Sequence, residues 1–561
     1  MIPLMAVSEK PAVKVAKTRV GLWGVPMPTH LVNIDAVIRR EDFEAKSDLI
    51  QQPSQLGTTL KVSELESSSI TFQTLRKPDF QRETASWKPE KVADLIRSFL
   101  DGDLIPSIIL WRSPGTGNIF VIDGAHRLGA LIAWVHDDYG DGKISRPFFD
   151  NRIPGEQIAA AEKTRNIIKK SIGTYEELKS ALQYPDNSSQ AAVRRARNLG
   201  AFAVPLQWVN GDATKAEASF FKINQLAAPI NETELKILES RNRPNALAAR
   251  AIIRAGTGHK YWAKFNDTSR ADIESLSKEI NDGLFLPPLS SPIKTLDLPI
   301  AGRVYSAQAL PLLFDLVNIA NDVGSEKKKA GVSEPILSDD SDGTKTIQFL
   351  KNTKRLVRRI SSTHPSSLGL HPAVYFYSST GRHQPTSFLA VVSLMKEFEK
   401  KDRFVAFTKN RRQFEDFILK YKEFVNQVVS KYGSGLKGFA ILERLFSTIL
   451  DGLESNKRDD EIVDLLRKDS KLSFLKLSET EIDGVRKDFS TEVKSAAFLK
   501  SALENPVRCQ ICDCLIHPNA TTIDHIEPKK DGGIGSPENA QLAHPYCNGT
   551  FKEQGHARAK Q

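Results

Sequence analysis

The spacing of apolar residues predicts the first clear element of the chain. Residues 89–101 begin with a proline, which suits the first turn of a helix, and their apolar positions recur at the spacing of one helical face. These apolar positions are Val92, Leu95, Ile96, Phe99 and Leu100. Gly102 follows and can end a helix in the left-handed conformation. The pattern therefore predicts an amphipathic helix that packs one face on a core.

Two short apolar runs after this helix predict a β-hairpin. They cover residues 108–111 and 119–122, and a Ser-Pro-Gly-Thr-Gly turn separates them. A further strand is expected at 202–209 and a helix at 216–225. Strands and helices mixed in this way are typical of an α+β domain.

Changes in pattern divide the chain into four parts. Residues 1–60 mix short apolar pieces with polar residues and are interpreted as an N-terminal extension, and residues 61–245 are interpreted as the α+β domain. Residues 246–500 are mainly helical in pattern, and residues 501–561 form a small C-terminal module. The predicted fold class is an α+β multidomain protein with a mainly helical middle domain.

The composition is that of a globular protein. Of 561 residues, 40% are hydrophobic and 26% are charged, which is too apolar for a disordered chain. The net charge of +10 favours a polyanionic partner. The sequence has no secretory signal and no apolar stretch near 20 residues, so we expect a cytoplasmic protein without a membrane partner. The sequence leaves the formation of a homo-oligomer open.

All four cysteines lie in the C-terminal module, which excludes a disulfide framework and favours a metal site. Cys509-x-x-Cys512 and His544-x-x-Cys547 are two knuckles that together offer a tetrahedral shell for structural zinc. A module this small needs a bound metal or another cross-link to fold. Cys514 is left over and is expected to be unliganded, because a Cys-x-x-Cys pair suits zinc better than Cys-x-Cys. A plain zinc ribbon would account for these ligands alone.

Residues between and after the knuckles extend this pattern. Asp524 and His525 stand together, and Asn539 and Asn548 follow. In order and spacing, residues 505–555 closely resemble the HNH endonuclease family, although a histidine ligand replaces the cysteine of many zinc-bearing members. The resemblance implies a ββα-metal fold that carries the catalytic residues of a nuclease.

The resemblance and the residue types together predict the catalytic roles. His525 would take a proton from the attacking water, because an imidazole is largely neutral near pH 7. Asp524 and Asn548 offer oxygen ligands for one Mg²⁺ or Mn²⁺, distinct from the zinc, and this ion would neutralise charge on the phosphate. Asn539 would orient His525 through its amide, as its counterpart does in the family. Lys552 is expected either to contact phosphate or to be a solvated charge.

A second set of motifs lies in the α+β domain. Residues 78–82 read Pro-Asp-Phe-Gln-Arg, residues 121–128 read Val-Ile-Asp-Gly-Ala-His-Arg-Leu, and residues 220–224 read Phe-Phe-Lys-Ile-Asn. Over about residues 65–245 these motifs resemble the ParB/sulfiredoxin-like domain of prokaryotic restriction and phage-defence proteins. The resemblance implies a pocket that binds a nucleotide, such as a nucleoside triphosphate, or that senses modified DNA.

The residue types in these motifs suit an anion site. An Asp-Gly pair at a strand-to-helix junction exposes backbone N–H groups, and arginines can bind phosphate oxygens. The expected nucleotide or phosphate site comprises Arg82, Asp123, Gly124, His126, Arg127 and Asn224. Ala125 replaces the glutamine that is usual in the family. We therefore expect the site to bind a nucleotide, and the sequence leaves open whether the site hydrolyses it. In a purely structural alternative, Asp123 and Arg127 form a salt bridge that holds the turn, and His126 packs or caps the helix.

The excess positive charge is concentrated in one segment. Between residues 351 and 412 there are thirteen basic and three acidic residues. We predict that this segment grips the DNA backbone through Arg355, Arg358 and Arg359, and a solvated basic face is the alternative.

The favoured function is a metal-dependent DNA endonuclease of restriction or anti-phage defence, with foreign or modified DNA as its partner. Nucleotide binding or sensing of modified DNA by the N-terminal domain would gate it. The alternative is a non-catalytic ParB-like protein that binds nucleotide and DNA for regulation and carries only a structural zinc module.

Overall fold

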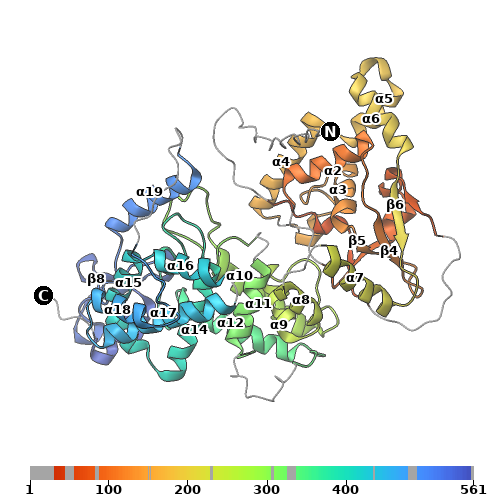
Figure 1. Ribbon diagram of the computed structural model, residues 1–561. Coiled ribbons are helices and arrows are strands. Elements are labelled where there is room, and N and C mark those ends of the chain that lie inside the picture. The colour runs from red at the N-terminus through yellow and green to blue at the C-terminus, as the bar shows by residue number, and fades with distance from the viewer. Residues whose placement is uncertain are drawn as a thin grey trace, which may run out of the picture.

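The computed structural model describes residues 31–43, 56–81, 87–149, 151, 153–227, 232–304, 309–324, 337–433, 436–477 and 489–556. Figure 1 shows an N-terminal part built on a β-sheet, a helical middle part, and a C-terminal module. Among the described residues, no helix combines the length and the apolar composition needed to cross a membrane. This arrangement agrees with the predicted α+β multidomain class.

The N-terminal part contains a mixed six-stranded sheet with the order β1-β3-β5-β4-β6-β2. The predicted hairpin is present, because β4 and β5 pair antiparallel with Trp111 opposite Phe120. Strands β1 and β2 lie at the two edges and come from the stretch interpreted as an extension, so part of that stretch belongs to this domain. The strands are β1 (Arg40–Glu41), β2 (Thr59–Leu60), β3 (Leu75–Pro78), β4 (Ile108–Arg112), β5 (Ile119–Asp123) and β6 (Val204–Trp208).

Helices cover both faces of this sheet. Val121 of β5 packs into a core with α2 and α3, whereas its neighbours Phe120 and Ile122 pack into a second core with Phe220 of α7. The alternation follows from the period of two along a strand. Helix α2 begins at Pro89, as predicted, and Gly102 ends it with φ +84°. The helices of this part are α1 (Ile70–Thr74), α2 (Pro89–Asp101), α3 (Ala125–Val135), α4 (Gly155–Ser171), α5 (Tyr175–Gln183), α6 (Gln190–Ala201), α7 (Ala213–Ala227) and α8 (Glu232–Glu239).

The middle part is helical, and its apolar faces form one large core. Each helix buries an apolar stripe, as α14 does with Phe388, Val391, Val392 and Met395. The helices are α9 (Pro244–Ile253), α10 (Asp267–Phe285), α11 (Ala309–Ala320), α12 (Thr344–Ile360), α13 (Pro372–Tyr375), α14 (Pro385–Lys401), α15 (Phe404–Lys420), α16 (Glu423–Tyr432), α17 (Leu436–Glu454), α18 (Asp459–Lys468) and α19 (Thr491–Glu504).

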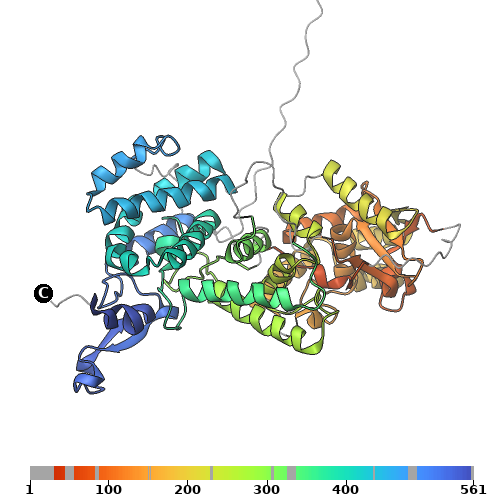
Figure 2. The ribbon, with the colours of Figure 1, turned by 90° about the horizontal axis from the view of Figure 1, so that it is seen from below.

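The C-terminal module is a two-stranded antiparallel sheet followed by a short helix. Its elements are β7 (Thr522–His525), β8 (Ala540–Ala543) and the C-terminal helix (Cys547–His556). Buried residues of this module, such as Ile511, Leu515 and Phe551, belong to the same core as the helical part. The module lies at the end of the molecule opposite the six-stranded sheet (Figures 1 and 2).

Candidate active site and metal centre

The two knuckles bring four ligands together. The side-chain ligand atoms of Cys509, Cys512, His544 and Cys547 all lie within 4.8 Å of one another, and all four residues are buried. The Nε2 atom of His544 lies 2.9 Å from the carbonyl oxygen of Leu515. When Nε2–H donates to this carbonyl, Nδ1 is free to bind a metal.

The chemistry of the four ligands fits zinc. The pKa of the Cys512 thiol lies well below its usual value, first because Cys509 hydrogen-bonds to its sulfur and then because Cys514 and Cys547 do so. A thiolate among two further cysteines and an imidazole is a suitable tetrahedral ligand set for Zn²⁺. Cys514 lies outside the group of four, and its thiol donates to the carbonyl oxygen of Cys512 at 3.4 Å.

A buried ion pair joins this metal centre to the helical part. Arg411 and Glu415 lie one turn apart on α15, their charged atoms are 2.7 Å apart, and both side chains are almost fully buried. Arg411 donates to the carbonyl oxygens of Leu368 and Gly369. The backbone N–H of Leu515, which follows the first knuckle, donates to Glu415 at 3.3 Å. The metal centre is therefore seated on the helical part.

The predicted catalytic pair lies on the strand next to the metal centre. Asp524 and His525 are the last residues of β7, and they pair with Gln541 and Ala540 of β8. Asp524 is buried, and its Oδ2 accepts hydrogen bonds from Gln541 (2.7 Å) and Lys552 (2.8 Å). Sequence reasoning missed Gln541, because its place opposite Asp524 depends on the register of the two strands.

The C-terminal helix closes the other side of this site. Asn548 donates through Nδ2 to the hydroxyl of Thr522 and the carbonyl oxygen of Ile523, both at 3.4 Å, which leaves its Oδ1 as the atom that can bind a cation. Lys552 contacts both the Asp524 carboxylate and the His525 carbonyl oxygen. Because Oδ1 of Asp524 accepts no hydrogen bond from the described residues, the pair of Asp524 and Asn548 offers two oxygen ligands that suit Mg²⁺ or Mn²⁺.

Asn539 holds the loop that follows the catalytic strand. Its Oδ1 accepts from the backbone N–H of Glu527 at 2.7 Å, and its Nδ2 donates to the carbonyl oxygens of Glu527 and Ile534. Its backbone carbonyl accepts from the N–H of Ile526, the residue after His525. The described hydrogen bonds of the Asn539 side-chain amide thus fix the loop beside His525. The sequence-based prediction was that this amide orients the His525 side chain.

The Asp-Gly turn of the predicted N-terminal site lies at the end of β5. Gly124 adopts φ +90° and precedes α3, so the expected strand-to-helix turn is present. Arg127 donates to Asp123 at 2.9 Å and to the carbonyl oxygen of Ser107 at 3.0 Å. This is the ion pair of the structural alternative, and its side chains are 21% and 35% exposed, so a ligand can still reach them.

The structure describes the other residues of this predicted site only in part. The ring of His126 stacks on Trp87 with 5.3 Å between centroids, which matches the packing role. Asn224 lies on α7, and Arg82 lies outside the described residues.

The predicted DNA-gripping arginines lie on α12 and differ in their surroundings. The side chain of Arg355 is 64% exposed and lies 3.5 Å from Glu399. Arg358 is 40% exposed and pairs with Glu279. Arg359 is only 19% exposed, donates to the carbonyl oxygen of Ser366, and packs over the ring of Phe404. Of the three, Arg355 is the most available to a phosphate.

Two protein-family models match the chain. Residues 62–237 match the GmrSD restriction endonuclease N-terminal domain, and residues 509–553 match the HNH endonuclease. No curated protein and no solved structure matched. The prediction of an HNH endonuclease domain joined to a domain of restriction proteins is confirmed, and together the two domains support a restriction or defence nuclease that acts on DNA.

Proposed function

We propose that the protein is a metal-dependent DNA endonuclease that hydrolyses phosphodiester bonds in foreign or modified DNA. The observation that carries this proposal is that β7 ends in Asp524 and His525 while Asn548 and Lys552 of the C-terminal helix contact the same strand, next to the Cys₃His group. A zinc ribbon without catalysis needs the four zinc ligands but has no use for a buried aspartate next to a histidine, with an amide and a lysine in contact with their strand.

Each residue has a defined part in the proposed reaction. His525 accepts the proton of the attacking water. Asp524 and Asn548 would hold Mg²⁺ or Mn²⁺, which when bound supplies positive charge to the developing phosphate oxyanion. Asn539 keeps the loop after His525 in place through its bonds to Glu527. Lys552 neutralises Asp524 and can exchange this contact for a phosphate oxygen when DNA enters.

The test is cleavage of plasmid and of modified phage DNA with Mg²⁺ or Mn²⁺, with and without nucleoside triphosphates. We expect the wild-type protein to cut and the His525→Ala variant, purified in parallel, to lose at least about 100-fold of the rate, the usual worth of a general base. EDTA should stop the reaction. DNA that stays intact under every condition would contradict the proposal, and retained DNA binding would then favour the non-catalytic regulator.

We further propose that the N-terminal domain gates the nuclease. A phosphate group at the Gly124 turn would compete with Asp123 for Arg127, and this exchange would signal an occupied pocket. An Arg127→Ala variant should then cut independently of nucleotide or DNA modification. The same dependence in wild type and variant would contradict gating through this residue.

A further inference from the structure

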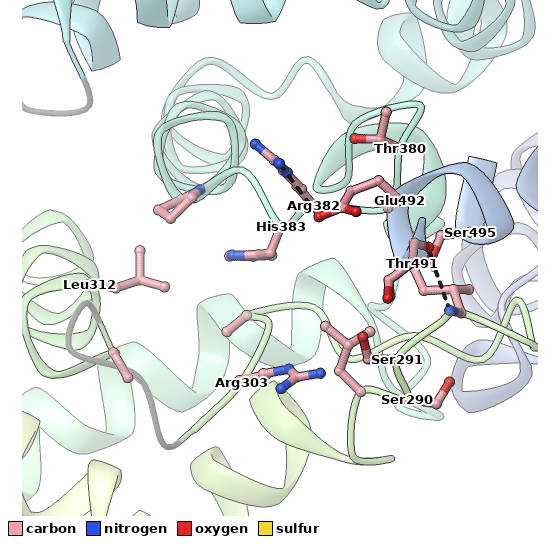
Figure 3. Close-up of a pocket in the computed structure, with 16 residues that line it drawn as sticks. Ser290, Ser291, Arg303, Leu312, Thr380, Arg382, His383, Thr491, Glu492 and Ser495 are labelled. Atoms are coloured by element: carbon pink, nitrogen blue, oxygen red, sulfur yellow. Dashed lines mark hydrogen bonds and ion pairs between the residues drawn. The ribbon is translucent and has the colours of Figure 1, made fainter. Parts of the chain in front are cut away.

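A cavity of about 310 Å³ lies where α19 meets the body of the helical part (Figure 3). Its walls come from residues 289–303, α11, the turn at 380–383, and the first turn of α19. The backbone N–H of Ile293 donates to the hydroxyl of Ser495 at 3.1 Å and so fixes α19 to one wall. Because α19 ends at Glu504, just before the first zinc knuckle, a ligand in this cavity would touch the element that leads to the nuclease module.

The cavity is lined by side-chain donors without a protein acceptor. Arg303 makes no hydrogen bond or ion pair with any described residue, and neither do the hydroxyls of Ser290, Ser291 and Thr491. Figure 3 shows Arg303, Ser291 and Thr491 around the same space, with His383 across from them. Ser290 is exposed and the other three are half-buried, so all four donors are available to the acceptor oxygens of a ligand.

The backbone turn at Gly302 places Arg303. Gly302 has φ +76°, and a Cβ there would lie 2.8 Å from the ring of His383. The Nε2 atom of His383 lies 3.1 Å from the carbonyl oxygen of Ile300. Burial lowers the pKa of His383 to about 4, so its ring is neutral at physiological pH and adds no charge to the cavity.

The charge of the cavity is positive. Arg382 pairs with Glu492 at 3.6 Å, but these side chains are 74% and 47% exposed, so the pair is weak and can open. Arg303 adds a guanidinium that forms no ion pair with a carboxylate of the described residues. A guanidinium beside several hydroxyls is a suitable site for a phosphate or carboxylate group.

We propose that this cavity binds a small organic phosphate of the size of a mononucleotide. Arg303, Ser291 and Thr491 would bind the phosphate oxygens, and the apolar wall of Leu289 and Leu312 would receive the rest of the molecule. A volume of about 310 Å³ is at the lower end for small-molecule sites. The bound molecule would hold α19 against the helical part. The position of the nuclease module would then depend on whether the small molecule is bound.

The test measures ligand binding to the full-length protein in the absence of DNA, so it does not depend on nuclease activity. Isothermal titration and thermal unfolding are carried out with AMP, CMP, GMP and UMP, with inorganic phosphate, and with adenosine as the uncharged probe. We expect at least one mononucleotide to bind, inorganic phosphate to bind more weakly, and adenosine not to bind. The Arg303→Gln and Thr491→Val variants should each weaken the mononucleotide at least about tenfold.

Arg127→Gln in the N-terminal pocket separates the two sites: mononucleotide binding that persists in Arg127→Gln and is weakened in Arg303→Gln belongs to this cavity. The proposal is overturned if no mononucleotide binds, if both cavity variants bind as the wild type does, or if binding is lost only in Arg127→Gln. A variant with a lowered melting temperature in the absence of ligand is replaced by Ser291→Ala, which removes one hydroxyl and no charge.

Discussion

At the scale of single residues, Gly369 lies next to the ring of His544, a predicted zinc ligand. It has φ +58°, and a Cβ at this position would lie 2.6 Å from Cδ2 of His544. We expect Gly369→Ala to shift this ring and to lower the zinc content measured by metal analysis after dialysis. Gly324→Ala is the matched control, because Gly324 also has a positive φ but has open space around it. Equal zinc content in the two variants would show that the contact is unimportant.

Lys422 is a buried residue that makes stability depend on pH. Burial lowers its pKa from 10.5 to about 7. Between these values the unfolded chain binds one more proton than the folded protein, so the free energy of unfolding should rise with pH by about 1.4 kcal/mol per unit. Below pH 7 both states are protonated, and this contribution becomes constant.

Replacement of Lys422 by methionine should remove this dependence. Urea unfolding from pH 6 to pH 9 should show that the wild type gains on the variant above pH 7, while the variant is the more stable protein at pH 6. The variant keeps the length of the aliphatic side chain, so packing changes little. Parallel curves for the two proteins would mean that the Lys422 ammonium is not held in the buried, unfavourable state that the structure indicates.

At the scale of elements, α15 carries two ion pairs of the same spacing in different surroundings. Arg411 and Glu415 are almost fully buried, and Glu415 accepts from the backbone of Leu515. Arg412 and Asp416 are 26% and 49% exposed, and there it is Arg412 that donates to the carbonyl oxygen of Asp513, so Asp416 itself does not contact the knuckle. Loss of one partner from a buried pair leaves an unpaired charge and costs about 3–5 kcal/mol, but an exposed pair contributes less than about 1 kcal/mol.

This comparison gives a matched pair of variants. We expect Glu415→Gln to lower the melting temperature strongly and to speed the release of zinc to a coloured chelator, because glutamine has one acceptor oxygen where Leu515 and Arg411 use two, and it leaves the buried Arg411 without a negative partner. Asp416→Asn should behave almost as the wild type. If both variants release zinc at the wild-type rate, α15 does not support the metal centre.

The elements also show what the sequence could predict. The helix from Pro89 to Gly102 and the hairpin of β4 and β5 were predicted because their signals are local: a proline, a glycine, a turn and the apolar spacing. The grouping of the four Cys₃His side chains was predicted because their spacing is a local signal at each knuckle. The edge strand β1 was not predicted, since two residues carry no period and their pairing with β3 depends on the folded sheet.

At the scale of the whole molecule, buried charges join the N-terminal and helical parts. Asp35 pairs with Arg40 and Lys77 of its own domain and with Arg254, which follows α9. Burial alone would raise the pKa of Asp35, but Arg40, followed by Lys77 and Arg254, outweighs it and keeps the pKa well below its ordinary value. The nuclease module lies at the far end of the molecule. A signal from the N-terminal domain must therefore pass through the contact around Asp35 and through the helical part.

Folding also changes the meaning of the charge count. The segment 351–412 has a large excess of basic residues in the sequence, but acidic residues from outside the segment pair with many of them. These pairs are Lys354 and Arg358 with Glu279, Lys396 and Lys400 with Asp322, Arg382 with Glu492, Arg403 with Asp451 and Glu454, Arg411 with Glu415, and Arg412 with Asp416. A count along the chain cannot include such partners, so it overstates the charge that DNA would meet.

The salt dependence of DNA binding tests how much of that charge is available. In the His525→Ala background without divalent metal, each lost phosphate contact should flatten the slope of log K against log salt by about 0.9. We expect Arg355→Gln to account for most of the effect of the triple change at Arg355, Arg358 and Arg359, because the other two are engaged.

Arg194 and Arg197 on α6 are exposed and have no ion-pair partner among the described residues, so their double change to Gln reports on a separate surface. If the helical segment grips DNA, this double variant keeps the wild-type slope. An unchanged slope in the triple variant would make the segment a solvated face, and a slope flattened by about 1.8 in the double variant would place the DNA on the N-terminal domain instead.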